Sequence, residues 1–282
     1  MNGPFATALQ AQDSGVAFPL PGITAAEAAA LLARIETIEA RHGGRWPKWL
    51  GAKPHLLFPW LWDLITDPRL TDPVAALLGP DLLCWQCNLI SKPPASAGYV
   101  AWHQDVTYYG LSEPRGVTVW LALTPTTPEN GCMSVVPFSH RMALDHHRPQ
   151  DPDNLLPLGE EIPAEPDPGT TVPVLLQPGE MSIHHMLTVH GSGPNRSAAR
   201  RSGLAIRYIA ADLVQSGEGV TAALVRGRDH GTFPLEQRPL AEDDPAARAH
   251  HDVVMRRWVR HITRAGAETA GGTSPAAGPG SG

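Results

Sequence analysis

Cysteine, net charge and long apolar runs are all scarce in this chain, and each shortage excludes a class of protein. Three cysteines in 282 residues are too few, and too odd in number, for a disulfide scaffold. A formal net charge of -6 from interspersed acidic and basic residues gives no broad cationic face, so we expect neither nucleic acid nor membrane as a partner. No stretch approaches the roughly 20 uninterrupted apolar residues of a membrane span.

The N-terminal residues 1–15 also lack the basic and apolar regions of a signal peptide. We therefore expect a soluble, cytoplasmic protein whose partner is a small-molecule substrate. The composition leaves its oligomeric state open.

The residues that are abundant indicate a β-rich domain. An apolar fraction of 42% is enough for a sizeable core, and 29 Pro with 27 Gly predict many turns rather than long helices. β-rich chains of this length often form one unit. We expect one domain over residues 1–265 and a disordered Gly, Ser, Pro and Ala tail over 266–282.

The N-terminal part, about 24–80, is predicted to be helical. Thr24 and Glu27 form a capping box ahead of apolar residues at helical spacing, which predicts a helix over about 25–42. Asp72 and Pro73 are expected to open a short helix that Gly79 closes. Residues 55–66 stay ambiguous because Pro59 interrupts an apolar run.

A jelly-roll core is predicted over about 82–225, where short β-prone runs are separated by Pro, Gly and Asn. The fold class is thus mainly β with flanking helices. The irregular segment 140–170 is expected to be a lid-like insertion over the substrate, and 244–264 a C-terminal helix. The expected strands are 82–91, 99–107, 117–124, 132–136, 172–177, 181–190 and 203–210.

Cys84 and Cys87 form a CxxC pattern, but they lie inside a predicted strand. Residues three apart on a strand point to opposite faces. Ordinary packing is therefore the better interpretation than redox or zinc chemistry.

His103 and Asp105 are the first candidate metal ligands. On a strand, residues i and i+2 face the same side and can share one ion. Two His and one carboxylate on one face are typical of non-haem iron(II) oxygenases, because they leave positions open for cosubstrate and oxygen. The same pattern recurs at 250–252, in a predicted helix where i and i+2 point apart, and there it cannot chelate.

His190 supplies the third candidate. It ends a predicted strand and is followed by turn residues, so its side chain should project into the mouth of the barrel. The next strand carries Arg200, Arg201 and Arg207. A guanidinium group could bind the distal carboxylate of a 2-oxoglutarate cosubstrate.

Taken together, these residues resemble the phytanoyl-CoA dioxygenase family of iron(II)/2-oxoglutarate oxygenases. The matching blocks keep the family's order over about 82–210: residues 102–105, 119–123, 129–133, 136–141 and 190–195, before Arg201. The resemblance implies a double-stranded β-helix, with Fe(II), 2-oxoglutarate and O2 as cofactor and cosubstrates.

The resemblance also implies individual roles. His103, Asp105 and His190 are the implied iron ligands, and Arg201 and Ser192 the cosubstrate contacts. Asn88 and Lys92 fall where the family often adds polar cosubstrate contacts, while Arg200 and Arg207 compete for salt-bridge or surface roles. By adjacency, the side chains expected near the substrate are Gln104, Tyr108, Tyr109, Trp120, His184 and His185.

The implied reaction is hydroxylation of an unactivated C–H bond, with succinate and CO2 as coproducts. Halogenating relatives lack the carboxylate that Asp105 supplies here. The expected substrate is a small polar metabolite or natural-product intermediate, such as an amino acid or phosphonate. Desaturation, cyclisation and epimerisation share the same ligands. A non-oxidative cupin-like metal enzyme and a small-molecule binding protein are the alternatives from other classes.

Overall fold

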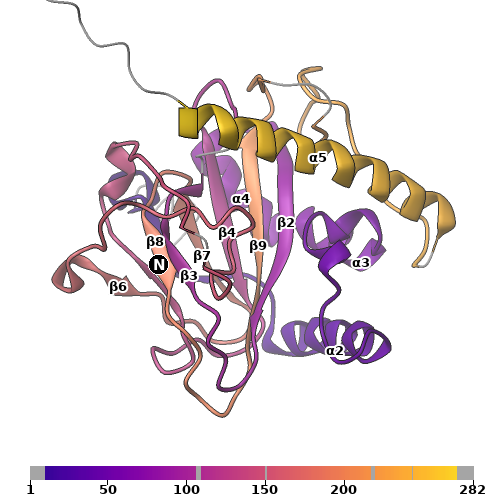
Figure 1. Ribbon diagram of the computed structural model, residues 1–282. Helices are drawn as coiled ribbons and strands as arrows, with labels where there is room; N and C mark the ends of the chain where they lie inside the picture. The colour runs from indigo at the N-terminus through magenta and orange to yellow at the C-terminus, as the bar shows by residue number, and fades with distance from the viewer. Residues whose placement is uncertain (1–9, 106–108, 150, 217–219, 243, 272–282) are drawn as a thin grey trace, which may run out of the picture.

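Two facing antiparallel sheets form the centre of the computed structural model, which describes residues 10–105, 109–149, 151–216, 220–242 and 244–271 (Figure 1). The larger sheet has six strands in the order β1-β7-β4-β9-β2-β10. The smaller sheet has four, in the order β3-β8-β5-β6. This is the jelly-roll architecture expected from the sequence.

The strand bounds agree with most of the predicted runs, but the predicted strands 99–107 and 172–177 are shorter in the structure, where they end at His103 and Pro173. The larger sheet comprises β1 (Val16–Pro21), β7 (Glu180–His185), β4 (Gly116–Ala122), β9 (Arg201–Ala210), β2 (Leu82–Lys92) and β10 (Ala223–Arg226). The smaller sheet comprises β3 (Val100–His103), β8 (His190–Ser192), β5 (Met133–Val135) and β6 (Val172–Pro173). The strand β1, which pairs with β7, was not predicted.

One predicted strand is in fact two. The run 181–190 breaks after His185, and the chain turns before β8 begins at His190. The first piece pairs with β4 in the larger sheet, whereas the second pairs with β3 in the smaller one. His184 and His190 therefore reach the space between the sheets from opposite walls.

A register shift in β2 corrects the expectation for the two cysteines. The pairing of β2 with β9 shifts between Cys84 and Gln86, which is the signature of a β-bulge. The extra residue changes the alternation, so Cys84 and Cys87 both belong to one buried apolar cluster. Both are free thiols, as a packing role requires.

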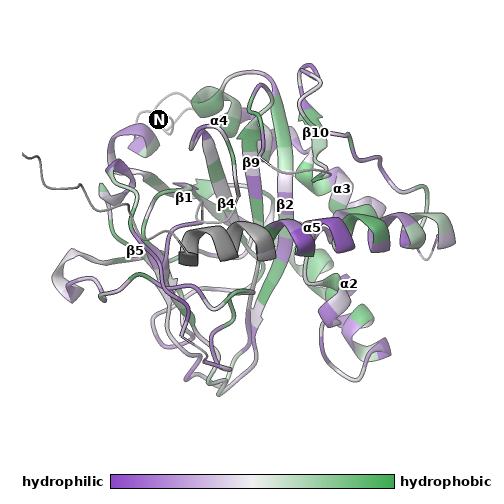
Figure 2. Ribbon diagram, turned by 45° about the horizontal axis from the view of Figure 1, so that its top comes forward, coloured by the Kyte–Doolittle hydropathy of each residue, from purple (hydrophilic) through white to green (hydrophobic). Residues whose placement is uncertain are grey.

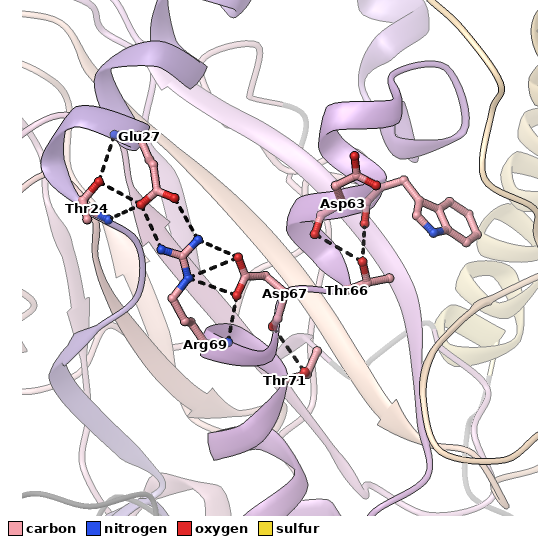
Figure 3. A network of polar contacts seen from close by, with 8 residues as sticks. Thr24, Glu27, Asp63, Thr66, Asp67, Arg69 and Thr71 are labelled. Carbon is pink, nitrogen blue, oxygen red and sulfur yellow. Dashed lines mark hydrogen bonds and ion pairs between the residues drawn. The ribbon is translucent and has the colours of Figure 1, made fainter.

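Helices α2 (Ala25–Arg41), α3 (Pro59–Ile65) and α4 (Pro68–Leu78) cover the larger sheet on one side, joined by the short 3-10 turns Lys48–Leu50 and Pro54–Leu56. The predicted capping box at Thr24 and Glu27 is present. Arg69 joins the two helix starts, because its guanidinium bonds both Glu27 and Asp67 (Figure 3).

The start of α4 differs from the prediction. Asp67 caps the helix by accepting a hydrogen bond from the Arg69 backbone N–H, and Pro68 takes the first helical position. Pro73, which was expected to open the helix, lies inside it. Both dipeptides are Asp-Pro, so the local pattern alone does not separate them.

The C-terminal helix α5 (Pro245–Gly271) crosses the strands β9 and β2 (Figures 1 and 2). It runs past the predicted end at residue 264. Two short 3-10 turns, Ser139–Arg141 and Pro168–Thr170, lie at the two ends of the 140–170 segment. Within the segment, Asn154 forms an isolated β-bridge with Tyr99, which directly precedes β3. No helix in the described ranges is long and apolar enough to span a membrane.

Candidate active site

Three of the predicted residues converge between the two sheets. His103, Asp105 and His190 are all buried, and one ligand atom from each lies within 4.8 Å of the others. The convergence follows from strand register, because His103 at the end of β3 is paired directly with His190 at the start of β8. Asp105 lies two residues beyond His103, as the HxD pattern requires.

Hydrogen bonds to the backbone orient both imidazoles. The Nδ1 atom of His103 lies 2.8 Å from the carbonyl oxygen of Ala101, and that of His190 lies 2.9 Å from the carbonyl oxygen of Thr188. With Nδ1–H donating to a carbonyl, Nε2 carries the free lone pair that a metal ion needs. Burial lowers the pKa of His190 well below its usual value, and the neighbouring His103 and His184 lower it further, so this ring is neutral.

The carboxylate of Asp105 is held on both oxygens. Thr118 Oγ donates to Oδ2 at 2.6 Å, and the Arg207 Nη2 donates to Oδ1 at 3.1 Å. Burial alone would raise the pKa of Asp105, but the charge of Arg207 and contacts with His103 and His184 hold it well below its usual value. The sequence analysis gave Arg207 a possible salt-bridge role without its partner, and it missed Thr118. Thr118 faces inward on β4, but nothing in its own strand distinguishes it from a core threonine.

These three side chains fit a divalent transition metal. Two imidazoles and one ionised carboxylate on one face provide the donor set of the non-haem iron oxygenases. His190 is neutral and Asp105 is ionised, so a metal ion can bind without displacing a proton from either side chain.

Next to the triad lie two buried cations with no acidic partner in the described part of the chain. Arg201 is 2% exposed, stacks 4.3 Å above the Trp120 ring, and leaves its Nε without a described hydrogen-bond partner. Lys92 is fully buried and donates to Ser192 Oγ at 2.6 Å. Burial lowers the pKa of Arg201 to about 10, and burial with the nearby Arg201 lowers that of Lys92 to about 7. An anion bound here would offset the burial of both charges.

The three candidate arginines now separate by their partners. Arg200 donates to both oxygens of Glu39 at 2.7 Å, and Arg207 pairs with Asp105. Arg201 has no such carboxylate among the described residues, which leaves it as the best anion-binding group of the three. The Arg207 Nη1 also donates to Asn88 Oδ1. Asn88, which was expected to contact the cosubstrate together with Lys92 and Ser192, therefore contacts Arg207 instead.

His184 also lies in this pocket. Its ring is 1% exposed, its Nε2 is 3.7 Å from Asp105 Oδ2, and its centroid is 4.5 Å from that of His190. Neither ring nitrogen has a hydrogen-bond partner in the described ranges. The expectation that His184 faces the cavity rested on one continuous strand. In the structure His184 lies on β7 of the larger sheet, whereas His190 lies on β8 of the smaller sheet.

Other predicted substrate contacts lie elsewhere. Gln104 anchors the 140–170 segment, since its amide donates to the carbonyl oxygens of Met142 and Leu187 and accepts from the Leu144 N–H. His185 lies beside His140, with ring centroids 5.5 Å apart. Alternation explains both positions, because each is the sequence neighbour of a residue that points inward.

Of the three aromatic candidates for substrate contact, Trp120 lies in the metal pocket and Tyr109 does not. Tyr109 is fully buried and stacks on Trp85 at 4.1 Å. Trp120 lines the pocket beneath Arg201. Tyr108 falls outside the described residues.

Known proteins resemble this chain in both sequence and fold. The family model of phytanoyl-CoA dioxygenase matches residues 12–203. A probable alpha-ketoglutarate-dependent hypophosphite dioxygenase from Stutzerimonas stutzeri is 32% identical over 161 residues, which cover 56% of each chain. A methylphosphonate hydroxylase from Gimesia maris is 28% identical over 148 residues, 52% of each chain. The chain spans about half the length of the curated relatives it matches.

Among solved structures, the apo form of the non-haem monooxygenase ThoJ is 36% identical, with a TM-score of 0.82. The match covers 93% of this chain and 99% of that one. Fold and site thus define a jelly-roll protein with a two-histidine, one-carboxylate centre. The chain belongs to the phytanoyl-CoA dioxygenase family.

Proposed function

We propose that the chain is an Fe(II)/2-oxoglutarate-dependent dioxygenase that hydroxylates an unactivated C–H bond of a small molecule. His103, Asp105 and His190 would hold the iron. The buried Arg201 beside them carries the proposal, because no described carboxylate pairs with it and a bound anion would offset the burial of its charge. A metal hydrolase or lyase of the same fold has no need of such an anion site.

The chain's own residues divide the work. Arg201, Lys92 and Ser192 would bind the distal carboxylate of 2-oxoglutarate, and Trp120 would keep the Arg201 guanidinium in place from below. Arg207 and Thr118 hold the Asp105 carboxylate, which fixes one corner of the metal site. Iron with 2-oxoglutarate and O2 supplies the oxidation, with succinate and CO2 as coproducts.

His184 would contact the molecules that bind at the open side of the metal. Its two nitrogens face a pocket that the triad also lines, and it is the buried histidine there that lacks a described partner. A ring in this position can donate to, or accept from, a bound oxygen atom.

The test uses anaerobic protein loaded with Fe(II). Adding 2-oxoglutarate should produce the weak visible charge-transfer band of a chelated 2-oxo acid. Arg201→Ala should weaken 2-oxoglutarate binding by about 100-fold, since charge-assisted hydrogen bonds contribute about 1.5–3 kcal/mol each. The affinity of the Arg201→Ala variant for Fe(II) should stay within about twofold of that of the wild type.

Arg200→Ala is the matched control, because Arg200 lies next in sequence but pairs with Glu39. It should leave the affinity for 2-oxoglutarate unchanged. Absence of the band in metal-loaded wild-type protein would refute the proposed function. Equal effects of the two variants would refute the assignment of Arg201.

A further inference from the structure

A second cavity, of about 680 Å³, lies between β2, the segment 154–157 and helix α5. We call it the α5 cavity. Its α5 wall is made by Met255, Trp258 and Val259. Figure 2 shows how α5 runs across the sheet at this point. Cavities that bind cofactors and drug-sized ligands commonly span about 300–1,000 Å³, so this volume suits a molecule larger than a single amino acid.

The α5 cavity meets the metal pocket. Four residues line both spaces: Ile90, Val100, Leu156 and Arg207. Arg207 connects the two chemically as well, because one end of its guanidinium bonds Asp105 and the other bonds Asn88, which lines the α5 cavity. These four side chains form the wall between the two spaces, so a molecule in the α5 cavity lies one layer of side chains from the triad.

Most of the wall is apolar and aromatic. Trp85 on β2 and Trp258 on α5 are both buried, and Leu89 and Met255 extend the same surface. Trp85 is held from behind by Tyr109, which stacks on it. Such a wall favours a ligand with an extended apolar body.

We propose that the α5 cavity binds the body of the substrate, and that the substrate is an extended, mainly apolar molecule. Its C–H bond to be oxidised would enter the metal pocket past Arg207. This inference rests on the proposed function and narrows it. Of the expected substrates, natural-product intermediates fit this cavity, whereas a free amino acid or a simple phosphonate would leave most of it empty.

The probe for this proposal is a series of N-acyl-alanine amides with linear acyl chains of increasing length. Protein loaded with Ni(II) and 2-oxoglutarate is titrated with each compound, and quenching of tryptophan fluorescence reports binding. Affinity should rise by about fourfold per added methylene until the cavity is full, which corresponds to about 0.8 kcal/mol per buried CH2.

Two valines on α5 give a matched pair of variants. Val259 lines the cavity and Val253 does not, yet both are partly exposed, at 49% and 37%, so each tolerates a polar residue. Val259→Asp should flatten the dependence on chain length, and Val253→Asp should preserve it. Met255→Trp, which narrows the cavity, should shorten the longest chain that still gains affinity.

An affinity that does not rise with chain length would overturn the proposal, as would equal behaviour of the two aspartate variants. The 2-oxoglutarate charge-transfer band is measured on the same Fe(II)-loaded proteins. A normal band with no chain-length effect refutes only the α5 cavity. A missing band refutes the proposed function itself.

Discussion

The metal pocket and the α5 cavity are adjacent, but different parts of the chain build them. The metal pocket is carried by strands and by residues directly after them, so strand register fixes the positions of His103 and His190. Besides strand β2, the α5 cavity is lined by helix α5 and by the irregular segment 154–157. The comparison indicates that the sheets place the metal-binding residues, whereas the segments packed on them shape the cavity proposed to bind the substrate.

The largest effect is expected from a substitution that disrupts the metal pocket alone. His190→Ala removes one of three ligands and should lower Ni(II) affinity by more than about 100-fold, since loss of even a supporting contact costs about 10- to 100-fold. Isothermal titration calorimetry measures this. His185→Ala, five residues earlier and outside the triad, should bind Ni(II) like the wild type. Unchanged binding by His190→Ala would contradict the ligand set.

A second change should disturb the α5 cavity and spare the metal. Gln104→Met keeps the side-chain volume but removes three hydrogen bonds, of which those with Met142 and Leu144 hold the 140–170 segment and the third goes to Leu187. At about 1 kcal/mol each, the free energy of unfolding should fall by about 2–3 kcal/mol. Limited proteolysis within 140–170 should accelerate, while Ni(II) affinity stays the same. Equal cleavage of both proteins would show that Gln104 does not anchor the segment.

The smallest effect concerns pH and the anion site. Burial lowers the pKa of Lys92 to about 7, so the amine is cationic below that pH and neutral above it. Affinity for the 2-oxoglutarate dianion should therefore fall, by less than tenfold per pH unit, as pH rises above about 7. Lys92→Met should bind more weakly at low pH and lose this dependence. The folded state also binds fewer protons than the unfolded chain between about pH 7 and 10, so Lys92 favours folding as pH rises.

The sequence predicted those features that depend on spacing along one strand. The two-residue spacing identified His103 and Asp105, but β3 ends at His103 and Asp105 lies just beyond it, so the predicted strand 99–107 was too long. The competing pattern at 250–252 lies inside α5, as predicted. The helical period likewise placed α2, although the start of α4 depended on which of two Asp-Pro pairs caps it.

The remaining features depend on contacts between distant segments. No local signal marks the turn that separates His184 from His190, or the bulge between Cys84 and Gln86, because partner strands impose both. Arg207 was one of three arginines on its strand, and its role followed only from the position of Asp105, 102 residues earlier. The α5 cavity combines several segments that are remote in sequence, and so it was not predicted.

The burial of the three thiols has a practical consequence for handling the protein in air. Burial raises the pKa of Cys84 well above its usual value, that of Cys87 to about 12, and that of Cys132 as well. The thiolate is the form that oxidants attack. The thiols of the folded protein should therefore resist oxidation in air without added reductant.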